Sequence, residues 1–426
     1  MTIIRRIETR GCGCDAPEPP ATLVSIDDAL GRMAQLARPV AATQTVPLLS
    51  ALGRVLADPV RAACMTPPFD NTAMDGYAVD TADFVGEGPW TFPVVATVPA
   101  GAVVPAVVGK GSVARIFTGA PLPLGADAVI RQEDARHSGQ GVTFETRPEG
   151  GSNIRRAGGD MRRGQIVVDA GTRLDPPEIA ACAAAGAGSV QVRRALRVGV
   201  LVTGDELWTP GTTRAPAGIW DVNTAMLCAA LGSSRIDLVH VERVGDRRDL
   251  LERSLAALAG QADLIVTAGG VSVGEEDHVK PALGALGGDV HFSGVAVKPG
   301  KPVSYGCIGK SHWLGLPGNP LAAFVMWQVF GTALVQRLTG QCVRRATRRH
   351  VVTAEAIRRK SGRCEIRPVT IAGFDARGRE VVRFEDATHS GRVGALPAAD
   401  GLMFLPAEVD HLPAGARVEF QPFCDA

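Results

Sequence analysis

The sequence predicts an α/β protein of several domains, built around a mostly parallel sheet with helices on both faces. From residue 197 to residue 267, apolar runs typical of buried strands alternate with segments of helical periodicity, in the order βαβαβ. Short apolar runs divided by Gly and Pro fill residues 90–146 and the chain beyond residue 350, which indicates two further β-rich regions. A chain of 426 residues has room for about two to four domains.

Composition excludes several classes of protein. The formal charge of +1 gives no basis for a nucleic-acid partner or an acidic membrane surface. Nine scattered cysteines without a CxxC pair favour reduced thiols over a disulfide framework. There is no apolar core of signal-peptide length, and we expect no apolar run of the roughly 18 residues that would span a membrane. The sequence therefore predicts a soluble cytoplasmic protein.

The N-terminal half begins with a tail, residues 1–22, that we expect to be disordered. Cys12 and Cys14 lie in this tail, where a metal-binding role is conceivable but a mobile segment is favoured. Further expected elements are a helix over 24–36 with Ser25 as N-cap, a second helix over 47–56, a polar loop over 66–80 and a helix over 172–186 that starts at DPPE.

The C-terminal half supplies the predicted sheet. We expect strands over 197–203, 236–241, 264–267, 303–305 and 313–316, and helices over 221–231, 247–259 and 321–338. A basic stretch, residues 344–350, is typical of a linker to the final β region.

Three loops are expected at the ends of strands: TGDE at 203–206, GGVSVGEED at 269–277 and GLPGNP at 315–320. In open α/β sheets, ligands bind at the carboxyl ends of the strands, so we expect the three loops to lie close together. Because the three loops are expected to converge, a binding role is more plausible for each of them than it would be from the residues of that loop alone.

The middle loop combines glycines with a cluster of acids. Glu275, Glu276 and Asp277 crowd one turn, and two unit charges about 4 Å apart repel by about 4 kcal/mol at an effective dielectric near 20. A phosphate-bearing ligand that carries Mg²⁺ would suit both the glycine N–H groups and the carboxylates. A solvated helix start near Glu275, with acids placed at its positive end, explains the same residues equally well.

A basic segment, SNIRRAGGDMRRG, leaves two interpretations open. Arg155, Arg156, Arg162 and Arg163 flank Asp160 and could clamp a phosphate or another oxyanion. A solvated basic turn accounts for the same residues and is favoured on the residues alone.

Seven motifs in sequence order resemble one family. They are PPFDNTAMDGYAVD, RIFTGAPLPLGADAVI, NIRRAGGD, TGDEL, TAGGVSVGEED, KPGKP and GLPGNP. Together they resemble the molybdopterin molybdenumtransferases, or MoeA proteins, which are similar to the E domain of gephyrin. The resemblance covers roughly residues 23–425. Single motifs such as TGDE are weak, but the ordered set is highly specific.

The resemblance implies an elongated subunit of four domains. The N-terminal domain would combine residues 23–62 with 157–195, and a β-rich domain, 63–156, would be inserted in it. Residues 196–342 would form an α/β molybdopterin-binding domain similar to the adenylyltransferase of the preceding step, and residues 343–426 a C-terminal β-barrel. Family members form homodimers, with an active cleft between the α/β domain of one subunit and the N-terminal domains of the other.

The implied reaction takes adenylylated molybdopterin and molybdate, releases AMP and leaves molybdenum on the dithiolene sulfurs, assisted by Mg²⁺. The family motifs assign catalytic roles to Asp75, Glu206, Asp277, Lys298 and Lys301. Charge then suggests Glu206, Asp246 and Asp277 as Mg²⁺ ligands, and Lys298, Lys301 and Arg155 as partners of molybdate or phosphate oxygens. Expected substrate-binding residues are Thr118, Arg155, Asp160, Gly269, Gly270, Ser272, Gly274, Pro317, Gly318, Asn319 and Pro320.

Alternatives remain for single residues and for the whole protein. Each acid could be a helix cap or a surface ion pair, Asp75 could bond within its own loop, and Lys298 could lie in a solvated turn. Many relatives carry a basic residue where this chain has Gly294, so the anion site is incomplete or another Arg compensates. Competing functions are a molybdopterin adenylyltransferase and a non-catalytic carrier or scaffold. Expected partners include the upstream adenylyltransferase and downstream cofactor-delivery proteins.

Overall fold

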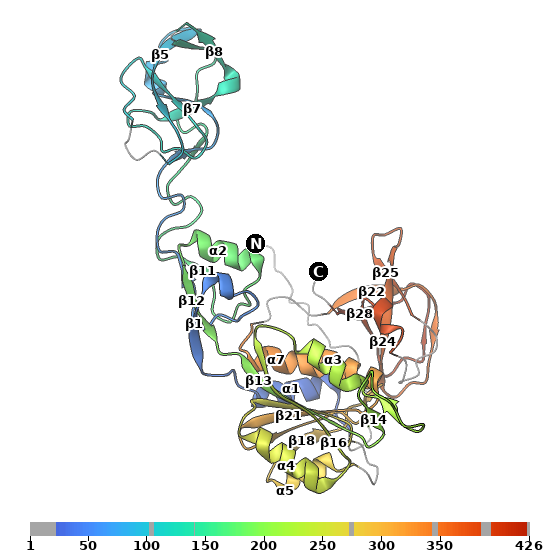
Figure 1. Cartoon of the computed structure of the whole chain (residues 1–426). Helices are drawn as coiled ribbons and strands as arrows, with labels where there is room; N and C mark the ends of the chain where they lie inside the picture. Colours follow the sequence, from blue (N-terminus) through green and yellow to red (C-terminus); the bar gives the residue numbers. More distant parts are fainter. Residues whose placement is uncertain are drawn as a thin grey trace. The chain divides into compact units, whose positions relative to one another are not determined.

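The computed structural model describes residues 23–101, 106–139, 141–271, 277–342, 348–384 and 393–423 (Figure 1). Its described residues form two compact units. Unit 1 contains the chain up to Gln44, the short piece Gly53–Val55 and everything from Arg193 onward. Unit 2 contains Thr45–Leu52 and Leu56–Val192. Each unit is described by itself below.

Unit 1 is organised around a six-stranded sheet with the strand order β16-β13-β17-β21-β20-β18. Four strands are parallel, and β20 and β18 add an antiparallel edge. Every residue of β17 is buried, as expected for a strand covered on both faces. The predicted mostly parallel sheet is thus confirmed. Its strands are β13 (Leu196–Thr203), β16 (Ile236–Val244), β17 (Leu264–Ala268), β18 (Asp289–Ser293), β20 (Ser304–Ile308) and β21 (Ser311–Leu316).

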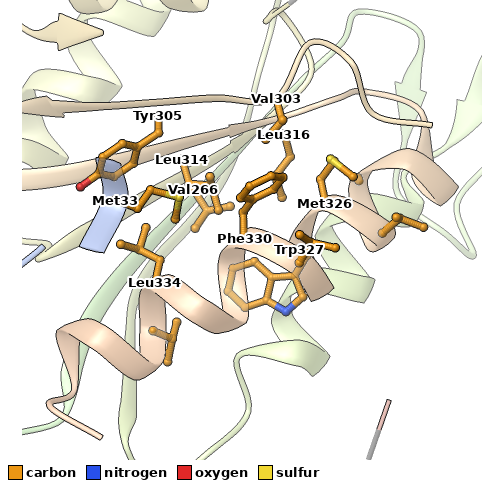
Figure 2. Packing of buried hydrophobic residues seen from close by; sticks show 14 of the residues in the cluster. Met33, Val266, Val303, Tyr305, Leu314, Leu316, Met326, Trp327, Phe330 and Leu334 are labelled. Atoms are coloured by element: carbon orange, nitrogen blue, oxygen red, sulfur yellow. The ribbon is translucent and has the colours of Figure 1, made fainter. Parts of the chain in front are cut away.

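Helices pack on both faces of this sheet. One face contacts α1 (Ile26–Leu36), α3 (Val222–Ala230) and the segment from α6 (Pro320–Met326) through a π-turn (Trp327–Gly331) to α7 (Thr332–Leu338). Figure 2 shows Val266 and Leu314 of the sheet against Phe330 and Leu334 of this segment. The other face carries α4 (Arg248–Ala259) and α5 (Val279–Ala285), whose side chains pack against Ile265 and Trp313.

The segment Pro320–Leu338 corrects one expectation. It is 19 residues long and, by length and composition, apolar enough to cross a membrane, so an apolar run of that length does exist. The segment lies against the sheet in the core of unit 1, and 67% of its apolar window is buried inside the protein. Its hydrophobicity is therefore explained by packing.

The C-terminal part of unit 1 is a closed β-barrel. Its strand order β24-β25-β22-β28-β26 closes because β24 also pairs with β26. Met403 and Phe420 lie in its core. The two-residue β19 (Val297–Lys298) adds to β24 in parallel. The barrel strands are β22 (Arg349–Thr353), β24 (Cys364–Phe374), β25 (Glu380–Arg383), β26 (Gly401–Leu405) and β28 (Arg417–Pro422), with the small pair β23 (Ile357–Arg358) and β27 (His411–Leu412) beside them.

Unit 2 holds a six-stranded sheet of its own with the order β7-β4-β6-β5-β9-β8. Its core is aromatic, with Tyr77, Phe84, Phe92 and Phe144 in contact. The strands are β4 (Gly76–Val79), β5 (Trp90–Val98), β6 (Val113–Ile116), β7 (Ala128–Arg131), β8 (Ala135–Ser138) and β9 (Gly141–Phe144). Outside this sheet lie α2 (Pro176–Ala184) and the short strands β2 (Val60–Arg61), β3 (Asn71–Thr72), β10 (Ile154–Arg155) and β11 (Ile166–Val168), with β1 (Thr43–Pro47) and β12 (Ser189–Arg193) at the border of the unit.

Several local predictions are confirmed by hydrogen bonds. Ser25 caps α1, because its Oγ accepts from the N–H of Asp28 at 3.0 Å. A capping box formed by Asp175 and Glu178 starts α2.

The helix expected over 47–56 is wrong. β1 runs to Pro47, and only a single 3₁₀ turn, Leu48–Ser50, follows. The segment is broken by Gly53, whose φ of 74° is incompatible with a right-handed helix. Helix α5 starts at Val279, and the helix start expected near Glu275 falls outside the described residues.

Candidate active site

The three predicted loops line one pocket of about 280 Å³ in unit 1. Thr203 ends β13 and Glu206 comes from the loop after it, Asp277 from the loop after β17, and Pro317 from the loop after β21. These strands are parallel neighbours, so their carboxyl ends meet at one edge of the sheet. We call this cavity the acidic pocket. It is lined by Thr203, Gly204, Glu206, Leu207, Ile219, Trp220, Val222, Asn223, Asp246, Gly269, Gly270, Val271, Asp277, Pro302, Pro317, Gly318 and Pro320.

Two glycines make the floor of the acidic pocket possible. Gly269 has a φ of 95°, and a Cβ there would lie 2.5 Å from the carbonyl oxygen of Thr203. Gly270 has a φ of 61°, and a Cβ would lie 2.9 Å from Cγ2 of Val279. Backbone of this kind can approach a ligand closely because no side chain stands in the way.

Three carboxylates predicted as metal ligands face the same cavity. Glu206, Asp246 and Asp277 all line the acidic pocket. Asp246 already accepts hydrogen bonds from Thr203 Oγ1 and from the Asp205 N–H, the latter at 3.1 Å. Within the described ranges, no three His, Cys, Asp or Glu side chains are gathered closely enough to hold a metal ion by themselves. The pocket offers acidic oxygens without a closed protein cage.

Asn223 adds a polar group that sequence analysis missed. Its Nδ2 donates to the Gly318 carbonyl at 2.7 Å, which fixes the orientation of the amide. The amide oxygen, Oδ1, is buried and has no hydrogen-bond partner among the described residues. Buried acceptors without a partner are rare, and this one belongs to a residue that lines the acidic pocket.

A wall of the acidic pocket is aromatic. The short strands β14 (Leu207–Trp208) and β15 (Ile219–Trp220) pair with each other, and Trp220 is the last residue of β15. Trp220 is 41% exposed. The guanidinium carbon of Arg214 lies 5.3 Å from the Trp220 ring centroid, within cation–π distance. The ring is therefore held in place yet open to a flat partner.

A second region beside the acidic pocket is cationic. Two cavities, of about 460 and 430 Å³, share Lys298, Lys301 and Arg363 in their walls, and we call them together the basic pocket. The larger one also shares Pro302, Pro317 and Gly318 with the acidic pocket. The remaining charged lining residues are Arg359, Lys360 and Glu365, all from the C-terminal barrel region and none of them predicted.

The turn that carries the two lysines is tightly constrained. Gly300, between them, has a φ of 105°, and a Cβ there would lie 2.4 Å from Cγ of Met326 in α6. The Val295 N–H donates to the Lys301 carbonyl at 2.9 Å. The lysine backbones are thus fixed on the sheet domain, which limits the directions that their ammonium groups can take.

Gly294 has a structural explanation. Its φ is 96°, and a Cβ would lie 2.7 Å from a methyl group of Leu23. A larger side chain would be strained at this backbone conformation. Arg359 and Arg363 line the basic pocket, and the Arg359 guanidinium is buried and paired with Glu365.

Four predicted residues lie in unit 2. Asp75 Oδ1 accepts from both the N–H and the Oγ1 of Thr118, each at 2.7 Å. These hydrogen bonds, led by the backbone N–H, lower the pKa of Asp75, so it stays ionised. Arg155 is exposed at the end of β10, and the Asp160 N–H donates to the Thr66 carbonyl at 3.0 Å. Two further predicted residues, Ser272 and Gly274, fall outside the described residues, as do Glu275 and Glu276.

Comparison with known proteins covers nearly the whole described chain. Three family models match: the MoeA N-terminal region (domain I and II) over residues 24–186, the probable molybdopterin binding domain over 199–337, and the MoeA C-terminal region (domain IV) over 350–423. The molybdopterin molybdenumtransferase of Haemophilus influenzae is 35% identical over 75% of this chain and 78% of its own. Molybdopterin molybdenumtransferase 2 of Mycobacterium tuberculosis is 33% identical over 92% of this chain and 96% of its own.

Solved structures agree with these matches. A crystal structure of the molybdopterin biosynthesis MoeA protein from Pyrococcus horikoshii is 28% identical, with a TM-score of 0.77, over 95% of this chain and all of that one. A crystal structure of a molybdopterin biosynthesis MoeA protein from Pyrococcus horikoshii OT3 is 25% identical, with a TM-score of 0.81, over 94% of this chain and all of that one.

Proposed function

The chain belongs to the molybdopterin molybdenumtransferase family, and from this premise we infer that it inserts molybdate into adenylylated molybdopterin and releases AMP. The observation that carries the inference is the acidic pocket placed directly beside the basic pocket. The reaction must neutralise and cleave a pyrophosphate bond, and it must bring a tetrahedral oxyanion to two sulfurs. Two pockets of opposite charge with a shared wall suit these two tasks.

The acidic pocket would bind the pyrophosphate together with Mg²⁺. Mg²⁺ prefers oxygen ligands and usually takes one or two carboxylates plus phosphate oxygens and waters, rather than a full protein cage. Glu206, Asp246 and Asp277, which line the acidic pocket, fit this requirement. When bound, the ion would offset phosphate charge and withdraw electrons from the bond that breaks. Gly269 and Gly270 would let the phosphates lie close to the backbone.

The basic pocket would receive molybdate. Lys298 and Lys301 both line it, and ammonium groups make strong charge-assisted hydrogen bonds to oxyanions. The lysines would hold molybdate oxygens and orient the anion toward the pterin sulfurs. Catalysis would then rest on positioning and electrostatic stabilisation instead of a nucleophilic side chain. We further propose that Asp75, Thr118, Arg155 and Asp160 of unit 2 contribute to substrate binding, as the family motifs imply.

The relatives named molybdopterin molybdenumtransferase favour molybdate insertion over an adenylyltransferase or a carrier. Molybdate insertion would use both the acidic pocket and the basic pocket.

The assembly and surroundings of the protein are proposed on the family resemblance. We propose a homodimer in the cytoplasm, receiving substrate from the upstream adenylyltransferase and passing product to cofactor-delivery proteins. The mass of the protein in solution, measured by analytical ultracentrifugation, tests the dimer. The four domain borders given in the sequence analysis are proposed on the same basis.

AMP release from adenylylated molybdopterin with Mg²⁺, measured with and without molybdate, tests the function. Molybdate-dependent release with molybdenum retained on the pterin is the expected result. Release without insertion would contradict the proposal and indicate a paralogue without an oxyanion site. Tight pterin binding without turnover would assign the protein to the carriers.

A further inference from the structure

We propose that Glu365 is a positioning residue for the oxyanion site: it holds Lys298 and the Arg359–Arg363 turn in the arrangement that binds molybdate. The proposal rests on the proposed function of the basic pocket. Glu365 is the only acidic side chain among the described residues that line this pocket. An acid in an anion site is unfavourable unless it serves the cations around it.

Strand pairing places Glu365 beside Lys298. β19 pairs in parallel with β24, and the register sets Lys298 opposite Glu365. The Nζ of Lys298 lies 3.7 Å from Glu365 Oε1, so the two side chains form an ion pair at the pocket wall. The Glu365 side chain is only 4% exposed, whereas that of Lys298 is 52% exposed. A buried carboxylate thus lies beside an exposed ammonium group at the pocket wall.

Arg359 connects Glu365 to the Arg359–Arg363 turn. Arg359 Nε lies 3.2 Å from Glu365 Oε2, and the Arg359 side chain is buried. Arg359 also donates to the carbonyls of Arg363, Pro406 and Val409, the last at 2.8 Å. The turn that carries Lys360 and Arg363 is therefore fastened to the barrel through one guanidinium, whose charge is balanced by Glu365.

Arg367 holds the carboxylate from its other side. Arg367 Nη2 lies 2.9 Å from Glu365 Oε1, and both side chains are buried. Glu365 is therefore shared by two buried guanidinium groups and one exposed ammonium group. Such a carboxylate has no open direction for a molybdate oxygen, which it would repel in any case. Its effect on molybdate must act through Lys298 and Arg359.

Removing the charge should weaken the anion site in a specific way. Without the carboxylate, Lys298 loses its fixed partner, and the cations of Arg359 and Arg367 repel each other. Molybdate binding should then suffer, while the adenylylated pterin, held in the acidic pocket, should bind as before. A purely structural role would lower stability without this selectivity.

The test compares Glu365→Gln with Glu419→Gln. Glu419 lies in the same barrel and pairs with the largely buried Arg348 at 3.1 Å, but it lines neither pocket. In Glu365→Gln we expect the Kd of the free enzyme for molybdate, measured by calorimetry, and the KM for molybdate to rise about tenfold, as for one misplaced charge-assisted contact. The KM for the adenylylated pterin should stay within about twofold of the wild-type value. Glu419→Gln should keep the wild-type affinities for molybdate and for the pterin.

The outcomes separate the proposal from its premise. Unchanged molybdate affinity in folded Glu365→Gln overturns the proposal, and so does an equal weakening in Glu419→Gln. If Glu365→Gln does not fold, Glu365→Asp is tested in its place. Its side chain keeps the negative charge but is one methylene shorter, so the carboxylate lies farther from Lys298. A smaller loss of molybdate affinity is expected there, and wild-type affinity overturns the proposal. Failure of the wild-type protein to release AMP with molybdate contradicts the proposed function instead.

Discussion

The acidic pocket and the basic pocket meet at Pro302, Pro317 and Gly318, yet they are built in different ways. Most of the acidic pocket consists of loops that directly follow buried parallel strands of one sheet. The basic pocket combines the turn after β19 with side chains of the C-terminal barrel. The topology of the parallel strands brings the lining residues of the acidic pocket together. The lining residues of the basic pocket are brought together by the packing of the C-terminal barrel against the turn after β19.

Because the two pockets are built differently, substitutions in them should have different effects. Backbone conformation shapes the acidic pocket, so changes at its glycines should act through folding as well as binding. Ion pairs shape the basic pocket, so changes of charge there should act on the affinity for the anion.

The largest effect is expected for Asp277→Asn in the acidic pocket. Loss of the carboxylate removes one oxygen charge that would hold Mg²⁺ and the pyrophosphate, so kcat should fall by roughly 10²- to 10³-fold and the KM for Mg²⁺ should rise. Asp249→Asn, an exposed acid on α4, is the matched control and should retain activity. Full turnover in Asp277→Asn would remove Asp277 from the metal site.

A smaller and different effect is expected for Lys301→Gln in the basic pocket. The loss of one charge-assisted hydrogen bond should raise the KM for molybdate by roughly 10- to 100-fold and leave the KM for Mg²⁺ unchanged. Initial rates over a molybdate titration measure this. Lys310→Gln, an exposed lysine in the turn between β20 and β21, should behave as wild type. A change in the Mg²⁺ requirement of Lys301→Gln would mean that the pockets are not separate.

Gly269→Ala should act through folding. The new Cβ would lie 2.5 Å from the Thr203 carbonyl oxygen at a φ of 95°, so the free energy of unfolding should fall by roughly 1–3 kcal/mol. Urea unfolding gives the value. Gly260→Ala, at the end of α4 with open space around it, is expected to be neutral. Equal stability of the two variants would contradict the close approach of backbone that defines the acidic pocket.

The smallest effect is expected for Trp220→Ala. Loss of a stacking surface should raise the KM for adenylylated molybdopterin by about 2- to 10-fold and leave the KM for molybdate unchanged. Phe374→Ala, which removes a ring that is 71% exposed on β24, controls for the loss of a surface aromatic. A selective rise in the KM for molybdate would instead place Trp220 with the basic pocket.

The acidic pocket could be predicted from the sequence, because its geometry follows from local patterns. The apolar run of β17 is recognisable as a buried strand, and parallel strands place their following loops at one edge. The wrong helix over 47–56 shows the limit of such patterns, because the positive φ of Gly53 interrupts the segment, which holds only the 3₁₀ turn Leu48–Ser50.

Half of the basic pocket could not be predicted. Arg359, Arg363 and Glu365 lie in a segment that by itself indicates only a strand with charged residues. Their role depends on the pairing of β19 with β24, which joins segments far apart in the chain. Asn223 was missed for a related reason: only the folded protein shows that its amide oxygen is left without a partner.

The division of labour between the pockets is tested most directly by titrating Mg²⁺ and molybdate separately against Glu206→Gln and Lys298→Gln. Both residues line only their own pocket among the described cavities, so their effects should not overlap. AMP release is measured over both titrations. We expect Glu206→Gln to raise the KM for Mg²⁺ alone and Lys298→Gln to raise the KM for molybdate alone. If either variant shifts both constants equally, the two pockets form one undivided site and have no separate roles.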